Sequence, residues 1–240
     1  MAPDSSDELL FAANPARDTR FTVKNHWIDC VNFPLEHPSR PIEFFHRQMN
    51  EEIDSLESSA RTLADFPKVD WEIRMWLARQ CSDEARHAAM YRKIFEKRGG
   101  VVGEYPVINF QYRIITKCDT LVGRLAIQNG TFEAGGLDAI HSGIHDCLQT
   151  GDSELAELYE SQLADEIMHV RFANEWIRSA IQNDPVNVMR IGKALTEASK
   201  AFHEVMGTEG IEGAAHPVAS IERIEAGFTP DEIKFTAGLR

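Results

Sequence analysis

The chain has 240 residues, of which 43% are hydrophobic, and its formal net charge at pH 7 is −13. This length and composition suit one domain with a sizeable core, while the excess of acidic residues disfavours binding to nucleic acid or to an anionic membrane surface. No apolar run approaches the roughly 18 residues that a membrane-spanning helix needs, and the acidic, polar start of the chain lacks a signal-peptide pattern. We therefore expect a cytoplasmic protein that binds neither membranes nor nucleic acid.

The expected secondary structure is irregular at first and helical from about residue 41. Five prolines among the first 41 residues predict an irregular N-terminal segment over 1–40. Apolar residues then recur with a helical period, and turns that contain proline or glycine separate the helical segments. Four long helices are expected at 42–65, 69–98, 112–149 and 153–182, a fifth at 186–206, and a short one after Pro230.

Four long helices joined by short or moderate connections predict an all-α protein of the four-helix-bundle class. No alternating apolar run of strand length competes with this interpretation. We assign the bundle to residues 41–183 and expect 184–240 to form a C-terminal helix and tail that pack on the bundle.

Two of the expected helices carry the same short motif. Glu84 and His87 lie in the second helix, Glu166 and His169 lie in the fourth, and both pairs have the spacing Glu-x-x-His. This spacing places a carboxylate and an imidazole one turn apart on the same helix face, where they can bind one metal ion. A third copy that ends at His46 has no partner glutamate at hairpin distance, so we interpret it as a chance occurrence.

The first and third helices each offer a glutamate at a matching depth. Glu52 precedes Glu84 by 84 − 52 = 32 residues, and Glu133 precedes Glu166 by 166 − 133 = 33 residues. All four glutamates lie on the apolar faces of their helices. Glu51 is an alternative to Glu52, but Glu52 shares a face with leucines and is preferred. Four buried carboxylates need compensation, which two divalent ions would supply, and this donor set suits iron or manganese.

The order of these residues resembles a known superfamily. Glutamate, Glu-x-x-His, glutamate and again Glu-x-x-His is the ligand order of the ferritin-like di-iron carboxylate proteins. The sequence DEARH at 83–87 is similar to the Asp-Glu-x-Arg-His element of the multicomponent di-iron monooxygenases, although the second copy has Met168 in place of arginine. Residues 47–183 more closely resemble an uncharacterised bacterial ferritin-like family, through FEAGGLD at 132–138 and DEIMHV at 165–170.

This resemblance implies a ferritin-like four-helix bundle with an additional C-terminal helix. It also implies two iron ions with O₂ as co-substrate, while manganese or a mixed iron–manganese centre stays open. Glu84 and Glu166 would bridge the ions and take part in catalysis. Asp83 and Asp165 would orient the histidines or simply be solvated neighbours, two interpretations that we weigh equally. The implied ligands are Glu52, Glu84, His87, Glu133, Glu166 and His169.

Other residues near the expected site have both a functional and a structural interpretation. Tyr91 and Tyr159 are candidate catalytic residues with a redox role, although a packed, hydrogen-bonded tyrosine is the commoner case. Glycines around Glu133 indicate either a distorted helix with room for a small molecule or close packing of helices. Gln80 could donate to a ligand carboxylate or satisfy another polar group. These glycines are Gly130, Gly135 and Gly136. Three further histidines, His141, His145 and His203, are expected to lie away from the metals.

The leading functional hypothesis is an O₂-dependent oxidase or oxygenase that acts on a small organic molecule. The segments outside the bundle, which a minimal iron-storage subunit does not need, favour it because they could cover a substrate pocket. An external electron donor and a homodimer fit this hypothesis. The alternatives are a ferroxidase or iron-handling protein and, third, a helical bundle in which the metal is a structural staple only.

Overall fold

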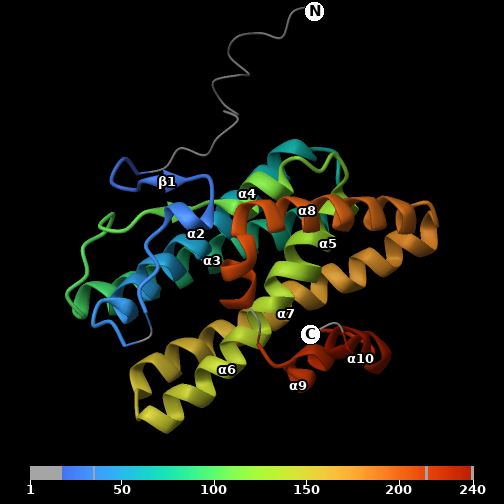
Figure 1. The fold of residues 1–240 in the computed structure, drawn as a ribbon. Coiled ribbons are helices and arrows are strands. Elements are labelled where there is room, and N and C mark those ends of the chain that lie inside the picture. Colours follow the sequence, from blue (N-terminus) through green and yellow to red (C-terminus); the bar gives the residue numbers. More distant parts are fainter. Residues whose placement is uncertain (1–17, 35, 214–215, 239–240) are drawn as a thin grey trace, which may run out of the picture.

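The computed structural model describes residues 18–34, 36–213 and 216–238, and helices dominate this part of the chain (Figure 1). The expectation of an all-α protein is therefore confirmed. The helices are α2 (Arg40–Asp65), α3 (Trp71–Lys97), α4 (Phe110–Ile115), α5 (Leu121–Ile127), α6 (Ala134–Thr150), α7 (Ser153–Asn183), α8 (Asn187–Gly213), α9 (Ser220–Glu225) and α10 (Pro230–Gly238).

Helices α2 and α3 form the first hairpin. Proline occupies the first turn of α2, where its fixed φ suits a helix start and its missing N–H costs no hydrogen bond. The hairpin packs on the rest of the molecule through residues such as Ile73 and Leu77, which are each 1% exposed. The stacked rings of Trp76 and Phe172, with centroids 5.1 Å apart, join α3 to α7.

The prediction of one continuous third helix over 112–149 is wrong in its first part. The chain forms the short α4, leaves helical geometry after Ile115 and starts again at α5. Asp54 of α2 accepts hydrogen bonds from the backbone N–H groups of Gln111 (2.9 Å) and Tyr112 (3.1 Å) at the start of α4. The side chain of Thr120 caps α5 by accepting from the N–H of Gly123. Two separate caps thus define two helix starts.

Between α5 and α6 the chain forms one π-helical turn, η2 (Gln128–Glu133). This turn holds one residue more than an α-helical turn would hold. The segments before and after it keep helical geometry, so α5, η2 and α6 form one continuous but distorted helical segment. A distorted helix was one of the two interpretations of the glycines around Glu133, and the structure has a distortion here.

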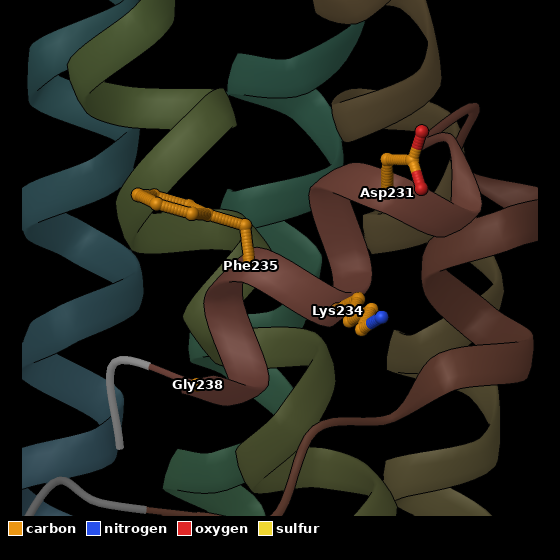
Figure 2. A pocket seen from close by; sticks show the side chains of 4 residues that line it. All are labelled: Asp231, Lys234, Phe235 and Gly238. Atoms are coloured by element: carbon orange, nitrogen blue, oxygen red, sulfur yellow. The ribbon is translucent and has the colours of Figure 1, made fainter.

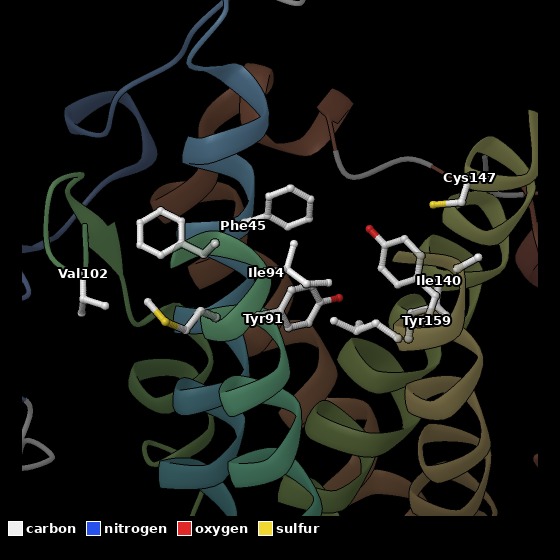
Figure 3. Close-up of a cluster of buried hydrophobic side chains, with 11 residues drawn as sticks. Phe45, Tyr91, Ile94, Val102, Ile140, Cys147 and Tyr159 are labelled. Carbon is white, nitrogen blue, oxygen red and sulfur yellow. The ribbon is translucent and has the colours of Figure 1, made fainter. Parts of the chain in front are cut away.

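Helices α6 and α7 form the second hairpin, which Figure 1 shows as two long antiparallel helices. Gly151 ends α6 in a left-handed conformation (φ 75°) that glycine adopts without strain. The carboxylate of Asp152 then caps α7 by accepting from the N–H of Leu155 at 3.3 Å. Tyr91, Ile94, Ile140 and Tyr159 form part of a buried apolar cluster that joins this hairpin to α2 and α3 (Figure 3).

Helix α8 lies along α4 and α5 (Figure 1). The rings of Phe110, Phe132 and Phe202 contact one another across this interface, with centroids 5.4–5.9 Å apart. The fifth helix was expected to end at residue 206, and the structure has a non-helical residue at Gly207 (φ 62°), after which the helix resumes. Helix α9 was not predicted, and it contacts α6 and α7.

The expected irregular segment over 1–40 lies partly outside the described residues, which leave out 1–17 and 35. Its described part contains the strand β1 (Val23–Lys24) and the 3₁₀ turn η1 (Trp27–Asp29). Strand β1 pairs in parallel with β2 (Val107–Ile108). Among residues 18–34, 36–213 and 216–238, no helix is long and apolar enough to cross a membrane.

We expect Asp54→Ala to lower the free energy of unfolding by about 2–4 kcal/mol, because two backbone N–H groups at the start of α4 would lose their acceptor. Asp54→Asn keeps one acceptor oxygen and should cost less. Urea unfolding followed by circular dichroism measures both changes. A loss below about 0.5 kcal/mol in the alanine variant would contradict the capping role.

Candidate metal centre

Six buried side chains from four helical segments meet in the interior. Their exposed fractions lie between 0% and 8%. Each of the two long hairpins contributes to the cluster, and the π-helical turn η2 contributes Glu133. The residues are Glu52 from α2, Glu84 and His87 from α3, Glu133 from η2, and Glu166 and His169 from α7.

The cluster consists of two overlapping groups of possible metal ligands. In each group, one ligand atom from every residue lies within 4.8 Å of the others. Glu84 and Glu166 belong to both groups, so their carboxylates stand between two potential ion positions. The first position also includes Glu52 and His87, and the second includes Glu133 and His169.

The Nδ1 atoms of both histidines point into the cluster. Nδ1 of His87 lies 3.2–3.3 Å from carboxylate oxygens of Glu52, Glu84 and Glu166. Nδ1 of His169 lies 3.1 Å from Glu166 and 3.6 Å from Glu84. Neighbouring ligand atoms of an octahedral ion, each about 2.1 Å from it, are separated by about 3 Å. The spacing of these atoms therefore fits ligands that share an ion.

The Nε2 atoms of the histidines face two aspartates in a crosswise arrangement. Asp83 of α3 lies 3.1 Å from Nε2 of His169 on α7. Asp165 of α7 lies 3.3 Å from Nε2 of His87 on α3. A carboxylate at Nε2 keeps the proton on that atom and leaves Nδ1 free for a metal. Arg86 forms an ion pair with Asp165 at the outer side of this arrangement.

Two glutamines hold the carboxylates, and each precedes a cluster glutamate by four residues. Nε2 of Gln80 donates to Glu84 and Glu133, both at 3.2 Å. Nε2 of Gln162 donates to Glu52 at 2.9 Å. The proposed hydrogen bond from Gln80 to a cluster carboxylate is thus present. Gln162 was missed, although its position before Glu166 matches that of Gln80 before Glu84.

Ser55 and Asn129 were also missed by the sequence analysis. The hydroxyl of Ser55 lies 2.6 Å from Glu133 and 3.0 Å from Glu84. Asn129 donates from Nδ2 to Gln80 at 3.0 Å. Ser55 follows Glu52 by three residues on the same helix face, and this spacing could have revealed it.

The two halves of the cluster are related but not equivalent. The residue that corresponds to Ser55 in the other half is Gly136, because each follows its glutamate by three positions. A Cβ atom at Gly135 or Gly136 would meet nothing within 4 Å, and one at Gly130 would meet only a backbone oxygen at 3.8 Å. Close helix packing therefore does not explain these glycines. The half that contains Glu133 therefore has a π-helical turn and half-buried glycines with free space beside the helix.

Burial changes the proton affinity of the carboxylates. It raises the pKa of Glu52 to about 8, although a hydrogen bond with His87 opposes this shift. Burial and the negative charge of Glu166 raise the pKa of Glu133 well above its ordinary value. Burial would also raise the pKa of Glu166, but hydrogen bonds with His169 and His87 outweigh it and lower that pKa well below the usual range.

The imidazoles retain protons for the same electrostatic reason. Burial alone would lower the pKa of His169, but hydrogen bonds with Asp83 and Glu166 raise it to about 10. Burial would likewise lower the pKa of His87, and hydrogen bonds with Glu166 and Glu52 raise it well above its ordinary value. These shifts favour protons on the cluster at neutral pH, and a divalent ion would compete with such protons for the same atoms.

The two candidate tyrosines lie outside the cluster, and Tyr159 lies farther from it than Tyr91. The hydroxyl of Tyr91 donates to Oε1 of Gln162 at 2.9 Å, so one amide separates it from Glu52. Tyr159 packs against Tyr91 with ring centroids 6.5 Å apart (Figure 3). A Cβ atom at Gly143 would collide with the ring of Tyr159, which explains the glycine there. Both tyrosines are buried, and their redox role stays a hypothesis.

The remaining candidates lie away from the cluster. Glu51 is paired with Arg47 at 3.4 Å and accepts from Gln48, so Glu52 is the residue of α2 that faces the cluster. His46 is buried and accepts from the N–H of Gly103 at 2.9 Å. The three histidines that were expected to lie away from the metals are exposed: His141 contacts Glu222, His145 contacts Gln149, and His203 contacts the backbone of Ser199.

A depression on the surface is lined by four residues of α10 (Figure 2). None of them belongs to the cluster. The lining residues are Asp231, Lys234, Phe235 and Gly238.

The fold and the cluster define an all-α protein with a buried carboxylate–histidine site. Over residues 5–234 the chain matches the family described as "Protein of unknown function (DUF455)", and it belongs to this family. The match includes α8 and α9 as well as the helices that form the cluster. No curated protein and no solved structure matches the chain significantly.

We expect metal binding to strengthen as the pH rises from 6 to 8. The pKa of Glu52 is raised to about 8 and that of His169 to about 10, so both hold protons in the metal-free protein near pH 7. A metal ion must displace these protons, and each displaced proton makes the affinity rise by up to about tenfold per pH unit. Titration calorimetry with Mn²⁺ in two buffers of different ionisation enthalpy measures the release. A pH-independent affinity without proton release would contradict this account.

We expect Asp83→Asn to weaken metal binding by about 10–100-fold, because the charge that orients His169 from the opposite helix would be lost. Asp165→Asn should have a similar effect through His87. Asp119→Asn, at an exposed position, is the control and should leave the affinity unchanged. If Asp83→Asn and Asp165→Asn bound the metal as tightly as Asp119→Asn, the crosswise pairs would not support metal binding.

Proposed function

We propose that the six-residue cluster binds two metal ions and that the protein is a ferritin-like di-metal carboxylate protein. The observation that supports this most directly is the overlap of two ligand groups, which share Glu84 and Glu166. Two overlapping groups suit two adjacent ions with bridging carboxylates. An isolated structural ion would need only one group.

The arrangement of the helices supports the ferritin-like assignment. The four helical segments supply a glutamate, a Glu-x-x-His pair, a glutamate and a second Glu-x-x-His pair, in that order, and all project inward. The resemblance of residues 47–183 to ferritin-like proteins points in the same direction. The first kind of support rests on positions in space and the second on sequence motifs.

The donor set fits the proposed ions. Four carboxylates and two imidazole nitrogens form a hard to borderline set that suits iron or manganese. Two divalent ions would balance four ionised carboxylates, as the protons do in the metal-free site. We assign two iron ions, and manganese or a mixed centre has the same donor chemistry. Two ferrous ions would supply the capacity to bind and reduce O₂.

We further propose that the protein is an O₂-dependent oxidase or oxygenase for a small organic molecule. Its residues would contribute burial, which excludes water, and carboxylates and imidazoles held in place by Asp83, Asp165 and the two glutamines. The ring of Phe202 on α8 packs against Phe132 of η2 and Phe110 of α4, so α8 covers part of this turn. An iron-storage role does not need such a cover. Electrons would come from the substrate or from an external donor.

The first test is the metal content of the purified and reconstituted protein, followed by mixing of the anaerobic ferrous protein with O₂ under stopped-flow absorbance. We expect about two irons per chain and a transient visible absorption band. Many irons per chain in a large assembly would instead favour iron storage. Two irons that do not respond to O₂ would favour a structural role, and no stoichiometric metal would exclude a metal centre.

Adjacent glutamates of α2 provide a matched comparison. Glu52→Ala removes a residue of the first ion position and should reduce the iron content from about two to one per chain. Glu51→Ala removes the same side chain one position earlier, where it pairs with Arg47 instead, and should keep both irons. Equal iron content in the two variants would contradict the assignment of Glu52.

A further inference from the structure

The chain after α8 crosses the outside of the second hairpin. The segment 219–228, which contains α9, contacts both α6 and α7 (Figure 1). Nδ2 of Asn174 on α7 donates to the backbone oxygen of Ala226 at 2.9 Å, and Arg171 donates to that of Glu225 at 2.6 Å. Ala226 is completely buried and packs with Leu137 of α6 and with α7. We call the segment 219–228 the strap.

Arg223 joins the strap to one turn of α6. Its Nε atom lies 2.9 Å from Oδ1 of Asp138 and its Nη2 atom lies 2.7 Å from Oδ2, so the pair is bidentate. Nη2 also donates to the backbone oxygen of Ala134 at 2.8 Å. The N–H of Ala219 donates to the same aspartate at 2.9 Å. Arg223 is 4% exposed and Asp138 is 0% exposed.

This turn of α6 begins directly after Glu133. Ala134 is the first residue of α6, and Glu133 is the last residue of η2. A guanidinium bound to both Ala134 and Asp138 therefore holds the backbone where the π-helical turn changes into an α-helix. The direction of the Glu133 side chain depends on the backbone at this junction. All three hydrogen bonds of the Arg223 side chain go to α6, whose first residue directly follows Glu133 of the second ion position.

We propose that Arg223 is a positioning residue for the ion position formed by Glu133 and His169. This inference rests on the proposed di-metal function. Arg223 acts through the backbone of Ala134 and sets the location of the Glu133 carboxylate. The first ion position lacks Glu133, and its distinct ligands, Glu52 and His87, lie on α2 and α3, which Arg223 does not contact. The C-terminal part of the chain thereby controls one half of the centre.

The test is a titration of the metal-free protein with Co²⁺, followed by visible absorption. In Arg223→Lys, the charge opposite Asp138 is kept but the fork geometry is lost. We expect the first equivalent to bind as in the unchanged protein and the second to bind at least about tenfold more weakly. Arg178→Lys is the matched control, because Arg178 ties α7 to Glu232 of α10 (3.1 Å) without contact to the junction. It should leave both equivalents unchanged.

Two further variants assign the affected equivalent. His169→Ala should remove the second equivalent, and Arg223→Lys added to His169→Ala should not change the equivalent that is left. Asp138→Asn should reproduce the selective loss if the lysine variant does not fold, as judged by circular dichroism. The positioning role would be overturned if Arg223→Lys weakened both Co²⁺ equivalents equally, or if it weakened neither. Fewer than two equivalents in the unchanged protein would instead overturn the proposed di-metal function.

Discussion

The burial of four carboxylates and two imidazoles in one small volume is the constraint on which the rest of the structure depends. Ionised groups removed from water need compensation close at hand. The raised pKa values of Glu52, Glu133 and His169 favour compensation by protons when no ion is bound. In the di-metal function proposed above, divalent ions would replace these protons. The pKa shifts and the distances between ligand atoms therefore both support that proposal.

Hydrogen bonds around the cluster also determine how the helices are placed. Asp83 and Asp165 connect α3 and α7 crosswise through the histidines. Ser55 connects α2 to both α3 and η2. Polar contacts of this kind depend on direction, whereas apolar packing tolerates some sliding of helices. The depth of each helix in the core is therefore set by the polar cluster as well as by the apolar residues around it.

Much of this arrangement could be predicted from the sequence. The spacing Glu-x-x-His, the apolar helix faces and the hairpin lengths are local features, and they were sufficient to predict that six side chains from four helices converge. The start of α4 could not be predicted, because Asp54, which accepts from its first N–H groups, lies far away in the sequence. Which histidine each aspartate faces depends on how α3 and α7 cross. The role of Arg223 likewise depends on a tertiary contact to α6.

The π-helical turn has a consequence for the whole third segment. One additional residue within a helix rotates everything after it by about 100° relative to an uninterrupted α-helix. Helix α5 packs against α8 as well as α7, while α6 packs mainly against α7. A continuous α-helix of this sequence would present one of these faces to the wrong neighbour. The turn therefore acts as a phase shift that lets one helical segment serve two different interfaces, with Glu133 at the point where the phase changes.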